Sequence, residues 1–576
     1  MLFHQYTIPP VAQQSVLPRP SFPGLAVLLS LLSLFQHFIR KQRSIHFTCP
    51  ITMSTKLSFL LLFLLQMIGS ARSQQVEWLT SNPVDFNINP DMPLHLVCAS
   101  DADHIYVARS TTLSYLYGTV YGNSVVEQRD ATGATTWSFT LGDSVLVQAM
   151  ASDGDGRVIL GGRFFNRVQL NGEQELSALF SDIFPETFLM ALDIDGNLLW
   201  QRNISPNDPQ GTELQAITFD PQGRAWYATC NFFRADINRL DDLGNDIETR
   251  PILDAKTIGS ISFDPQGGLY VSGGAGEPGM TLNGTFYPIT SGYSMFVARM
   301  GVDGAAQWLH TAVDITFQRP RVQADDFGHA YLVGAPFDSL SWGDLYFNGP
   351  EWNSTFFVTR LDSTGHFEWG YQPPQGEPFS GQFTLGRDQV LGVDEVGNAT
   401  ILGVTNGMVD WGNNVVTNAG GITERAVTLL QLDTAGTPHW QLQGSSPDYD
   451  VPQSLSVLPN GICHLAVQVR DTFQLGGFTA ELSSPHVVVA RVAPVTTGIA
   501  ESTVGSLAIY PSPFSSTFTI SNPMGSKARV SIFDASGRIV ARENRTDHLG
   551  NTLPPGSYVI EMVQDGNRSI GRVVKE

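Results

Sequence analysis

Short apolar runs separated by turn sequences recur along most of the chain. One recurring unit is Asp-x-x-Gly followed by an apolar or aromatic run that predicts a strand. Glycine suits a positive φ and aspartate suits bonding to nearby backbone N–H groups, so the unit predicts a tight turn between antiparallel strands. Clear copies begin at Asp153, Asp220, Asp264, Asp325 and Asp394, and worn copies begin at Ser100 and Leu458.

A second unit alternates with the first and carries a tryptophan four residues after its glycine. The last repeat has the strand 486–492 without a following turn, whereas Trp78 opens its strand without a preceding turn. The pattern therefore predicts that the strand of Trp78 lies in the sheet of 487–492 and completes the last repeat, which avoids a bare sheet edge. The tryptophans of this unit are Trp137, Trp200, Trp308, Trp369 and Trp440, and a worn copy at Asp241–Gly244 lacks one.

The two units give seven repeats over residues 74–496, or about 60 residues each. Because the commonest propeller repeats have roughly 40–50 residues, each repeat is expected to carry one long loop. We predict an all-β fold: a seven-bladed β-propeller followed by a small immunoglobulin-like β-sandwich. The five tryptophans are expected at equivalent buried positions between blades.

The repeats resemble the bacterial seven-bladed propeller repeats of the SBBP type over most of residues 76–496. They are also similar to quinoprotein-type propellers, whose repeats carry Asp-x-x-Thr-Gly-x-x-x-Trp, because Asp130–Trp137 contains Thr132 and Gly133. The two families share this turn chemistry. The resemblance therefore implies a propeller and leaves its activity open.

The region after residue 496 reads as a polar linker, 497–503, and a separate unit of alternating strands, 504–576. This unit resembles the type A C-terminal sorting domain of the type IX secretion system, found in Bacteroidota. The matching segments are Tyr510–Phe514, Val530–Val540, Leu553–Tyr558 and Val573–Lys575, with Ser512 where the family usually has Asn. The resemblance implies that the secretion machinery binds residues 504–576 and that the protein is secreted or displayed on the outer-membrane surface.

The N-terminal region reads as a targeting segment rather than as fold. Residues 53–73 combine Lys56, an apolar run from Leu57 to Leu65, and small residues before a cleavage point after Ser73, which is the layout of a signal peptide. Residues 1–52 are then a misassigned extension, and the competing interpretation is an uncleaved N-terminal anchor. No membrane span is predicted in the mature chain.

Charge and cysteine content exclude several classes of function. The net charge of −21 repels phosphate backbones and anionic lipid, so nucleic-acid binding is not expected. Cys49, Cys98, Cys230 and Cys463 show neither metal-ligand nor redox spacing, so they are interpreted as small buried hydrophobic residues. Asp153 and Asp193 resemble the starts of calcium loops, but no closing glutamate follows, and turn formation is the preferred interpretation.

No catalytic, cofactor-binding or metal-binding residues are predicted, and no cofactor is expected. His329, His366 and His464 follow turn glycines, where exposed side chains are expected. We favour a non-catalytic binding or scaffolding propeller with an unidentified glycan or protein ligand. The alternatives are a glycosidase or lyase acting on extracellular polysaccharide and, less favoured, a quinoprotein-like dehydrogenase. Three loops carry aromatic residues that suit stacking on sugars or peptide, although packing against neighbouring blades is the preferred interpretation: Phe164–Phe180, Thr281–Tyr293 and Trp342–Trp352.

Overall fold

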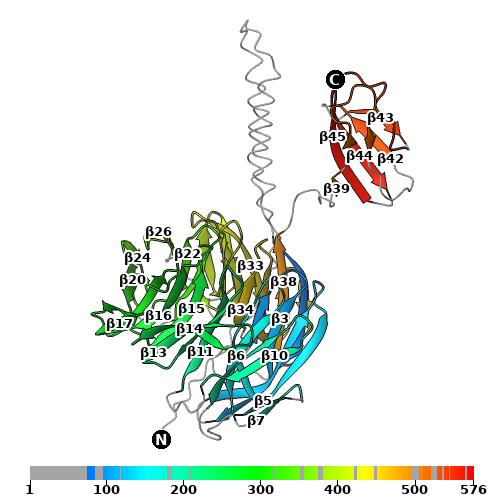
Figure 1. Cartoon of the computed structure of the whole chain (residues 1–576). Helices are drawn as coiled ribbons and strands as arrows, with labels where there is room; N and C mark the ends of the chain where they lie inside the picture. Colours follow the sequence, from blue (N-terminus) through cyan, green and yellow to red (C-terminus); the bar gives the residue numbers. More distant parts are fainter. Residues whose placement is uncertain are drawn as a thin grey trace, which may run out of the picture. The chain divides into compact units, whose positions relative to one another are not determined.

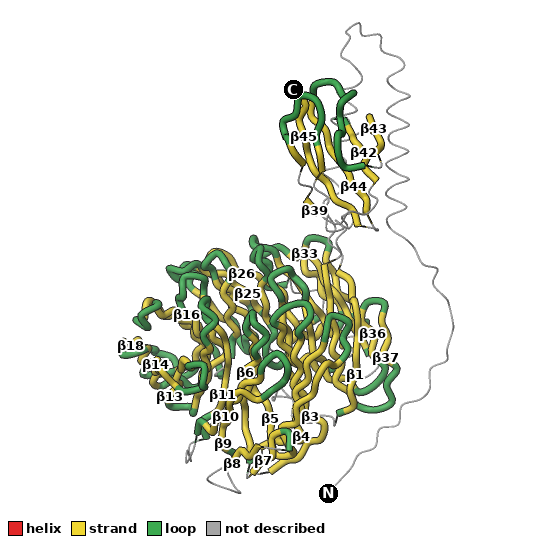
Figure 2. The backbone as a smooth tube through the Cα atoms, turned by 45° about the vertical axis from the view of Figure 1, so that its right-hand side comes forward, coloured by secondary structure: helices red, strands yellow, loops and turns green. Residues whose placement is uncertain are grey.

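The computed structural model shows only strands, turns and irregular segments in the part of the chain that it describes (Figure 2). The predictions for residues 1–73, Cys49 included, and for the linker 497–503 lie outside that part. The described residues are 74–84, 95–116, 119–165, 167–172, 174–177, 185–205, 211–316, 319–349, 356–373, 381–420, 425–446, 450–494, 505–506, 509–520, 529–534, 538–543, 545–564 and 567–576.

Residues 74–494 form antiparallel groups of strands, and each group takes the name of its innermost strand (Figure 1). The β2 group contains β2 (His95–Ala99), β3 (Ile105–Leu116), β4 (Thr119–Arg129) and the first half of β5 (Thr135–Ser152). The β5 group contains the second half of β5, β6 (Val158–Phe164), β9 (Glu186–Leu192) and β10 (Leu198–Asn203).

The same order of inner to outer strands continues along the chain. The β11 and β15 groups contain β11 (Glu213–Phe219), β12 (Ala225–Cys230), β13 (Arg234–Leu240) and β14 (Asp246–Leu253), then β15 (Thr257–Phe263), β16 (Leu269–Ala275), β19 (Ser294–Met300) and β20 (Ala306–Val313). The β21 group contains β21 (Arg321–Ala324), β22 (Ala330–Gly334), β25 (Phe357–Leu361) and β26 (Phe367–Tyr371). In the β28 group, β27 (Gln382–Leu385) and β28 (Leu391–Val393) both pair with β29 (Ala399–Asn406), and β32 (Arg425–Leu432) and β33 (Pro438–Ser445) follow.

The β34 group is completed by the start of the described chain. It contains β34 (Val451–Val457), β35 (Cys463–Val469), β38 (His486–Pro494) and, as its outer strand, β1 (Gln74–Pro83). Trp78 lies opposite Arg491 in the β1–β38 ladder, so the predicted pairing of the Trp78 strand with 487–492 is confirmed. The outer edge of this group is therefore covered by a strand about 400 residues away in the sequence.

The Asp-x-x-Gly units form the predicted turns. In the turn that starts at Asp193, the carboxylate Oδ1 accepts the backbone N–H groups of Asp195 and Asn197 at 3.0 and 2.8 Å. Gly196 ends the turn at φ +83°, a conformation that favours glycine. The same aspartate-to-backbone bonds recur at Asp153, Asp220, Asp264, Asp325 and Asp394.

Trp78 and the tryptophans of the second unit other than Trp440 lie on the glycine turn of the next group, whereas the indole N–H of Trp440 donates to Gln431 of its own group. The indole of Trp137 is so close to Gly196 that a Cβ there would lie 2.6 Å away, and its Nε1–H donates to the carbonyl of Ile194 at 2.9 Å. Trp78, Trp308 and Trp369 each donate an equivalent hydrogen bond from the indole N–H to the backbone carbonyl of the second residue of the next turn. These contacts join the outer strands of neighbouring groups.

The prediction that all five tryptophans are buried is wrong for four of them. Trp440 is buried, but the other four are half-buried, because each stands on an outer strand with only one face on the next turn: Trp137, Trp200, Trp308 and Trp369. In the β11 group, which lacks the tryptophan, Arg250 takes its place. Its guanidinium donates to the carbonyls of Gly301 and Val302 in the next turn at 3.3 and 2.9 Å.

The inner strands lie side by side and run in the same direction. The succession β2, β5, β11, β15, β21, β28, β34 returns from β34 to β2. At that return, the N–H groups of Val97 and Ala99 donate to the hydroxyls of Ser454 and Ser456 at 2.8 and 3.2 Å. The buried clusters combine side chains of neighbouring groups, for example Val97 and Val107 with Val487 and Val489. The apolar core thus lies between the groups.

The extra length of the repeats forms β-hairpins rather than free loops. Each hairpin leaves its group between the second and third strands and packs on the outer strand of the preceding group, as β17 pairs with β14 and β36 pairs with β33. In Figure 2 the β36–β37 hairpin lies beside β1. The hairpins are β7 (Arg167–Leu170) with β8 (Gln174–Ser177), β17 (Gly279–Leu282) with β18 (Thr285–Pro288), β23 (Leu340–Trp342) with β24 (Leu345–Phe347), β30 (Met408–Gly412) with β31 (Val415–Asn418), and β36 (Phe473–Leu475) with β37 (Phe478–Ala480).

The C-terminal region has a separate sheet and its own core. The sheet order is β39-β45-β44-β42-β43, with the small pair β40–β41 beside it. Its buried residues, which include Phe514, Val530, Ile560 and Val573, all come from residues 514–573. The strands are β39 (Gly505–Ser506), β40 (Ile509–Tyr510), β41 (Thr519–Ile520), β42 (Arg529–Phe533), β43 (Ile539–Glu543), β44 (Gly556–Gln564) and β45 (Asn567–Lys575).

Candidate functional site

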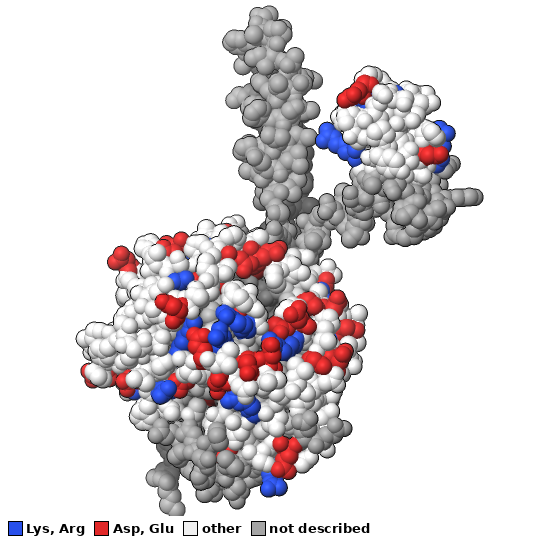
Figure 3. All heavy atoms as spheres, viewed as in Figure 1, with Lys and Arg blue, Asp and Glu red and all other residues white. Residues whose placement is uncertain are grey.

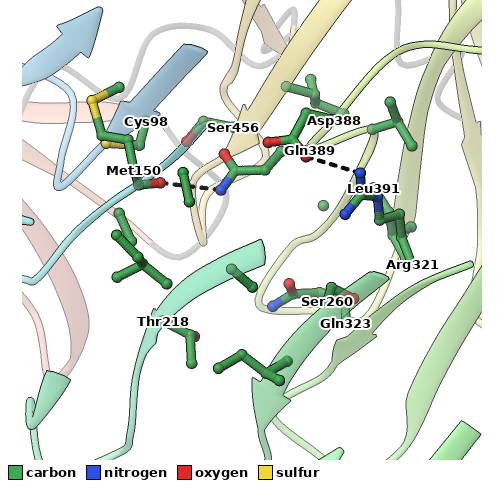
Figure 4. Close-up of a pocket in the computed structure, with 18 of the residues that line it drawn as sticks. Cys98, Met150, Thr218, Ser260, Arg321, Gln323, Asp388, Gln389, Leu391 and Ser456 are labelled. Atoms are coloured by element: carbon green, nitrogen blue, oxygen red, sulfur yellow. Dashed lines mark hydrogen bonds and ion pairs between the residues drawn. The ribbon is translucent and has the colours of Figure 1, made fainter. Parts of the chain in front are cut away.

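A pocket of about 230 Å³ lies where the inner strands meet (Figure 4). Every inner strand contributes to its wall. The lining residues are 98–99, 149–152, 215–218, 259–261, 321–323, 388–393 and 455–457. Because these segments are far apart in the sequence, the pocket exists only when the groups are assembled.

The wall of the pocket is polar for a site inside a β-fold. Four half-buried side chains on it carry hydroxyl or amide groups: Thr218, Ser260, Gln323 and Ser456. The hydroxyl of Ser260 also accepts the N–H of Val322 at 2.6 Å and so links β15 to β21. Such a wall offers hydrogen-bond donors and acceptors to a polar ligand.

Gln389 reaches across the pocket. It precedes β28, yet its Nε2 donates to the backbone carbonyl of Met150 on β5 at 3.1 Å, as the dashed line in Figure 4 shows. Its own carbonyl accepts the N–H of Leu455 on β34. Gln389 therefore ties three groups together at the level of the pocket.

An ion pair closes one side of the pocket. The guanidinium Nη2 of Arg321 lies 2.8 Å from the carboxylate of Asp388, and the side chains are 14% and 9% exposed (Figure 4). Burial raises the pKa of Asp388 against the attraction of Arg321, and burial lowers the pKa of Arg321. A second pair, Arg163 with Glu213, joins β6 to β11 at the start of the inner strands.

The buried histidine and cysteine side chains near the inner strands are held in their neutral forms. Burial, with the charge of Arg109, lowers the pKa of His95 to about 3, and neither ring nitrogen has a hydrogen-bond partner within the described part of the chain. Burial raises the pKa of Cys98 to about 12. Cys98, Cys230 and Cys463 are all buried and free, which confirms their interpretation as small buried residues. These groups are neutral at pH 7 and stay out of acid–base or thiolate chemistry.

The prediction for the turn histidines is wrong for His464. Its side chain is fully buried on β35, where Tyr106, Tyr270 and Tyr331 hold the equivalent place in other groups. His366 is exposed as predicted, and His329 is half-buried beside Asp325 and Arg360. Both exposed and buried side chains follow the turn glycine within a few residues. The spacing from the glycine alone therefore does not distinguish an exposed histidine from a buried one.

Two of the predicted aromatic loops prove to be hairpins whose main aromatic residues pack inward. Trp342 and Phe347 are buried against the β15 and β21 groups, and Phe164 and Phe165 are buried as well. The preferred interpretation, packing against neighbouring repeats, is confirmed for these four side chains, because the hairpins fold onto the preceding group. The exposed aromatics are Phe286, Tyr293 and Tyr346, while Phe180 and Trp352 lie outside the described residues.

The interpretation of the Asp-rich segments as turns is confirmed. Both carboxylate oxygens of Asp153 are used, one by the N–H groups of Asp155 and Arg157 and the other by the guanidinium of Arg157. Among the described residues, no three His, Cys, Asp or Glu side chains are grouped to hold a metal ion. The pocket and its ion pairs, which the sequence did not indicate, are the strongest candidate site.

The comparison with family models identifies the end of the chain. Residues 508–576 match the secretion system C-terminal sorting domain. The tail is a type IX sorting domain. It implies export by the type IX secretion system, interaction with that machinery, and a cell-surface or secreted location. No helix among the described residues has the length and apolar character needed to cross a membrane.

The comparison with solved structures gives remote similarities to the rest of the chain. A catalytically inactive virginiamycin B lyase from Staphylococcus aureus with quinupristin is 10% identical, with 73% of this chain and 100% of that chain covered and a TM-score of 0.39. A puromycin hydrolase is 11% identical, with 84% and 62% covered and a TM-score of 0.35. A protein from Lactobacillus plantarum is 12% identical, with 62% and 85% covered and a TM-score of 0.32.

These similarities carry no activity or substrate over to this chain, because the identities and TM-scores are low. The matched region spans 62% of the puromycin hydrolase. No curated protein matches this chain by sequence.

Proposed function

We propose that residues 74–494 form a closed seven-bladed β-propeller of the SBBP type that is displayed or released by type IX secretion and binds an extracellular ligand in its central pocket. The sorting domain is proposed to be a small immunoglobulin-like sandwich. Its sheet of β39 and β42–β45, the β40–β41 pair and a shared core support that arrangement.

Two sets of contacts support the proposed closed ring, one among the inner strands and one among the outer strands. Each of the seven groups places an inner strand beside the next, and the serine bonds from Ser454 and Ser456 connect β34 to β2. On the outside, β1 completes the β34 group, and Trp78 donates to Ala131 in the β2 group. A ring of this kind places the start of every inner strand on one face.

The observation that carries the binding function is the polar pocket on the ring axis. Its wall is built from all inner strands, so its shape is fixed by the whole fold rather than by a mobile loop. The strongest polar groups there, Arg321 and Asp388, are held in place by their ion pair. A rigid polar pocket is suited to recognising a small polar group.

A propeller enzyme acting on polysaccharide is the second candidate. It is favoured by one observation: Asp388 lines the pocket and its pKa is raised, as expected for a general acid. The ion pair with Arg321 argues against a free acid in this state.

The test uses the mature chain, residues 74–576, on a glycan array alongside a polysaccharide-turnover assay. Gln323→Trp fills the pocket without removing a protein hydrogen bond, and Gln169→Trp, on the exposed face of β7, is the matched control. We expect binding to be lost in Gln323→Trp and kept in Gln169→Trp, at equal melting temperatures. Binding that survives Gln323→Trp would refute the pocket, and turnover that Asp388→Asn abolishes would establish the enzyme instead.

A further inference from the structure

Positive charge gathers at the start of the inner strands, in a chain whose net charge is −21. Five charged side chains, called the charged rim below, stand at this end of the inner strands, and two of them, Arg321 and Asp388, line the pocket: Arg163, Glu213, Arg319, Arg321 and Asp388. They come from β6, from the start of β11, from the segment before β21, from β21 and from the segment before β28. Elsewhere basic and acidic side chains are interspersed on the face turned to the viewer in Figure 3.

Two of the three arginines already have their counter-charge. Arg321 pairs with Asp388, and it also donates to the carbonyls of Gly259 and Arg387. Arg163 pairs with Glu213, whose second oxygen accepts the amide of Gln215 at 3.4 Å. With three cations and two anions, the charged rim has one uncompensated positive charge.

Arg319 carries that uncompensated charge. Its side chain is exposed, and it has neither an ion pair nor a hydrogen bond to the described residues. It nevertheless interacts electrostatically with Arg163, Arg321, Asp388 and Cys230, which belong to four different groups of strands. Arg319 directly precedes Pro320, whose carbonyl oxygen packs on Gly259 of the pocket wall, and it stands two residues before Arg321 of the same wall. Arg319 therefore lies beside the pocket wall, with a side chain that is open to solvent.

We propose that the charged rim is an anion-binding subsite in which Arg319 takes one carboxylate or sulfate group of an acidic sugar. This inference rests on the proposed binding function and specifies its ligand class. The guanidinium is planar and offers paired N–H donors that match a carboxylate or sulfate. One monoanionic group neutralises the excess charge and relieves the repulsion among three arginines.

A sugar is the ligand class that suits the rest of the pocket. The hydroxyl and amide groups of Thr218, Gln323 and Ser456 lie below the charged rim and can bond to sugar hydroxyls. A volume of about 230 Å³ is below the roughly 300–1,000 Å³ of sites for larger ligands, so one sugar ring is expected to enter. That ring is either a free uronic acid or the end of an acidic polysaccharide.

Isothermal titration calorimetry on the mature chain tests the proposal. Glucuronate should bind about 10- to 150-fold more tightly than glucose, because a charge-assisted hydrogen bond contributes about 1.5–3 kcal/mol. Added salt should reduce this advantage. Arg319→Gln should remove it without changing the affinity for glucose, and Arg319→Lys should keep part of it. Arg167→Gln, at an exposed site on β7, is the matched control and should change neither affinity.

Two further ligands identify the source of the anion. If hyaluronan oligosaccharides bind more tightly than glucuronate, the ligand is the end of a polysaccharide chain. If only glucuronate binds, the ligand is a free sugar. Inorganic sulfate bound through Arg319, with no acidic sugar bound, would overturn the sugar assignment. Equal binding of glucose and glucuronate, unchanged in Arg319→Gln, would overturn the charged rim while the binding pocket stands. No binding by any of these ligands or on the glycan array would count against the proposed function itself.

Discussion

Two buried histidines should make the fold sensitive to mild acid. His464 lies on β35, opposite Ser456 of β34 and Arg491 of β38, and its ring centroid is 6.2 Å from that of Trp78. Neither of its ring nitrogens has a hydrogen-bond partner among the residues that the structure describes. Burial, with the charge of Arg491, lowers its pKa from 6.5 to about 3, and His95 shows the same shift beside Arg109.

The sign and size follow from proton linkage. The unfolded chain takes up a proton at each histidine below pH 6.5, whereas the folded chain resists it down to about pH 3, so stability falls as the pH falls through this window. Between pH 7 and pH 5, each histidine costs about 2 kcal/mol and the pair about 4 kcal/mol. This is a large part of a typical stability of about 5–15 kcal/mol.

Denaturant unfolding at pH 7, 6 and 5 measures the effect, and tryptophan fluorescence is the suitable signal because all ten tryptophans precede residue 441. His464→Gln should remove about half of the loss between pH 7 and pH 5. His366→Gln, at an exposed turn, is the control and should leave the loss unchanged. If His464→Gln unfolds with the same pH dependence as the parent chain, the buried neutral imidazole is not the cause.

Three other predictions concern the joints between groups and the tail. Gly196→Ala should cost about 1–3 kcal/mol more than Gly172→Ala, because both glycines have positive φ but only Gly196 lies under the indole of Trp137; Trp137→Ala should remove the difference in thermal denaturation. Arg250→Met should destabilise the fold by about 2 kcal/mol or more, since it leaves the carbonyls of Gly301 and Val302 without their donor; an unchanged melting temperature would show that the arginine is not a joint. Deleting residues 497–576 should block surface delivery and leave a protease-resistant propeller in the periplasm, because the tail core is separate, and surface labelling of the shortened chain would contradict this.

The parts of the fold that repeat locally could be predicted from the sequence. The Asp-x-x-Gly spacing located the turns, and the unpaired Trp78 strand indicated its distant partner 487–492. Both features could be predicted because the same short motif contacts an equivalent neighbouring segment in each group. Arg250 escaped prediction because it takes over the function of a tryptophan from a different position and with different chemistry.

The candidate site could not be predicted in the same way. The pocket is lined by segments between residues 98 and 457, and no local pattern says which alternate residues of an inner strand face the axis. Arg163 and Glu213 become neighbours only when β6 and β11 are side by side. The exposure of a hairpin aromatic depends on the same assembly, since Trp342 is buried in a cluster that combines residues of the β15 and β21 groups.

Because β38 lies between two strands, its position determines how the β34 group responds to a mechanical pull on the C-terminal tail. In its ladders, Pro494 lies opposite Gln74 of β1, and Val492 lies opposite both Val76 of β1 and Cys463 of β35. The chain leaves β38 at Pro494 towards the sorting domain, so a pull on the tail acts along β38 and loads both ladders in shear, where many hydrogen bonds must break together. A pull between the tail and an anchored Gln74 would instead open the β1–β38 ladder one bond at a time. A pull on the tail therefore leaves the β1–β38 ladder intact more readily when the chain is not held at Gln74.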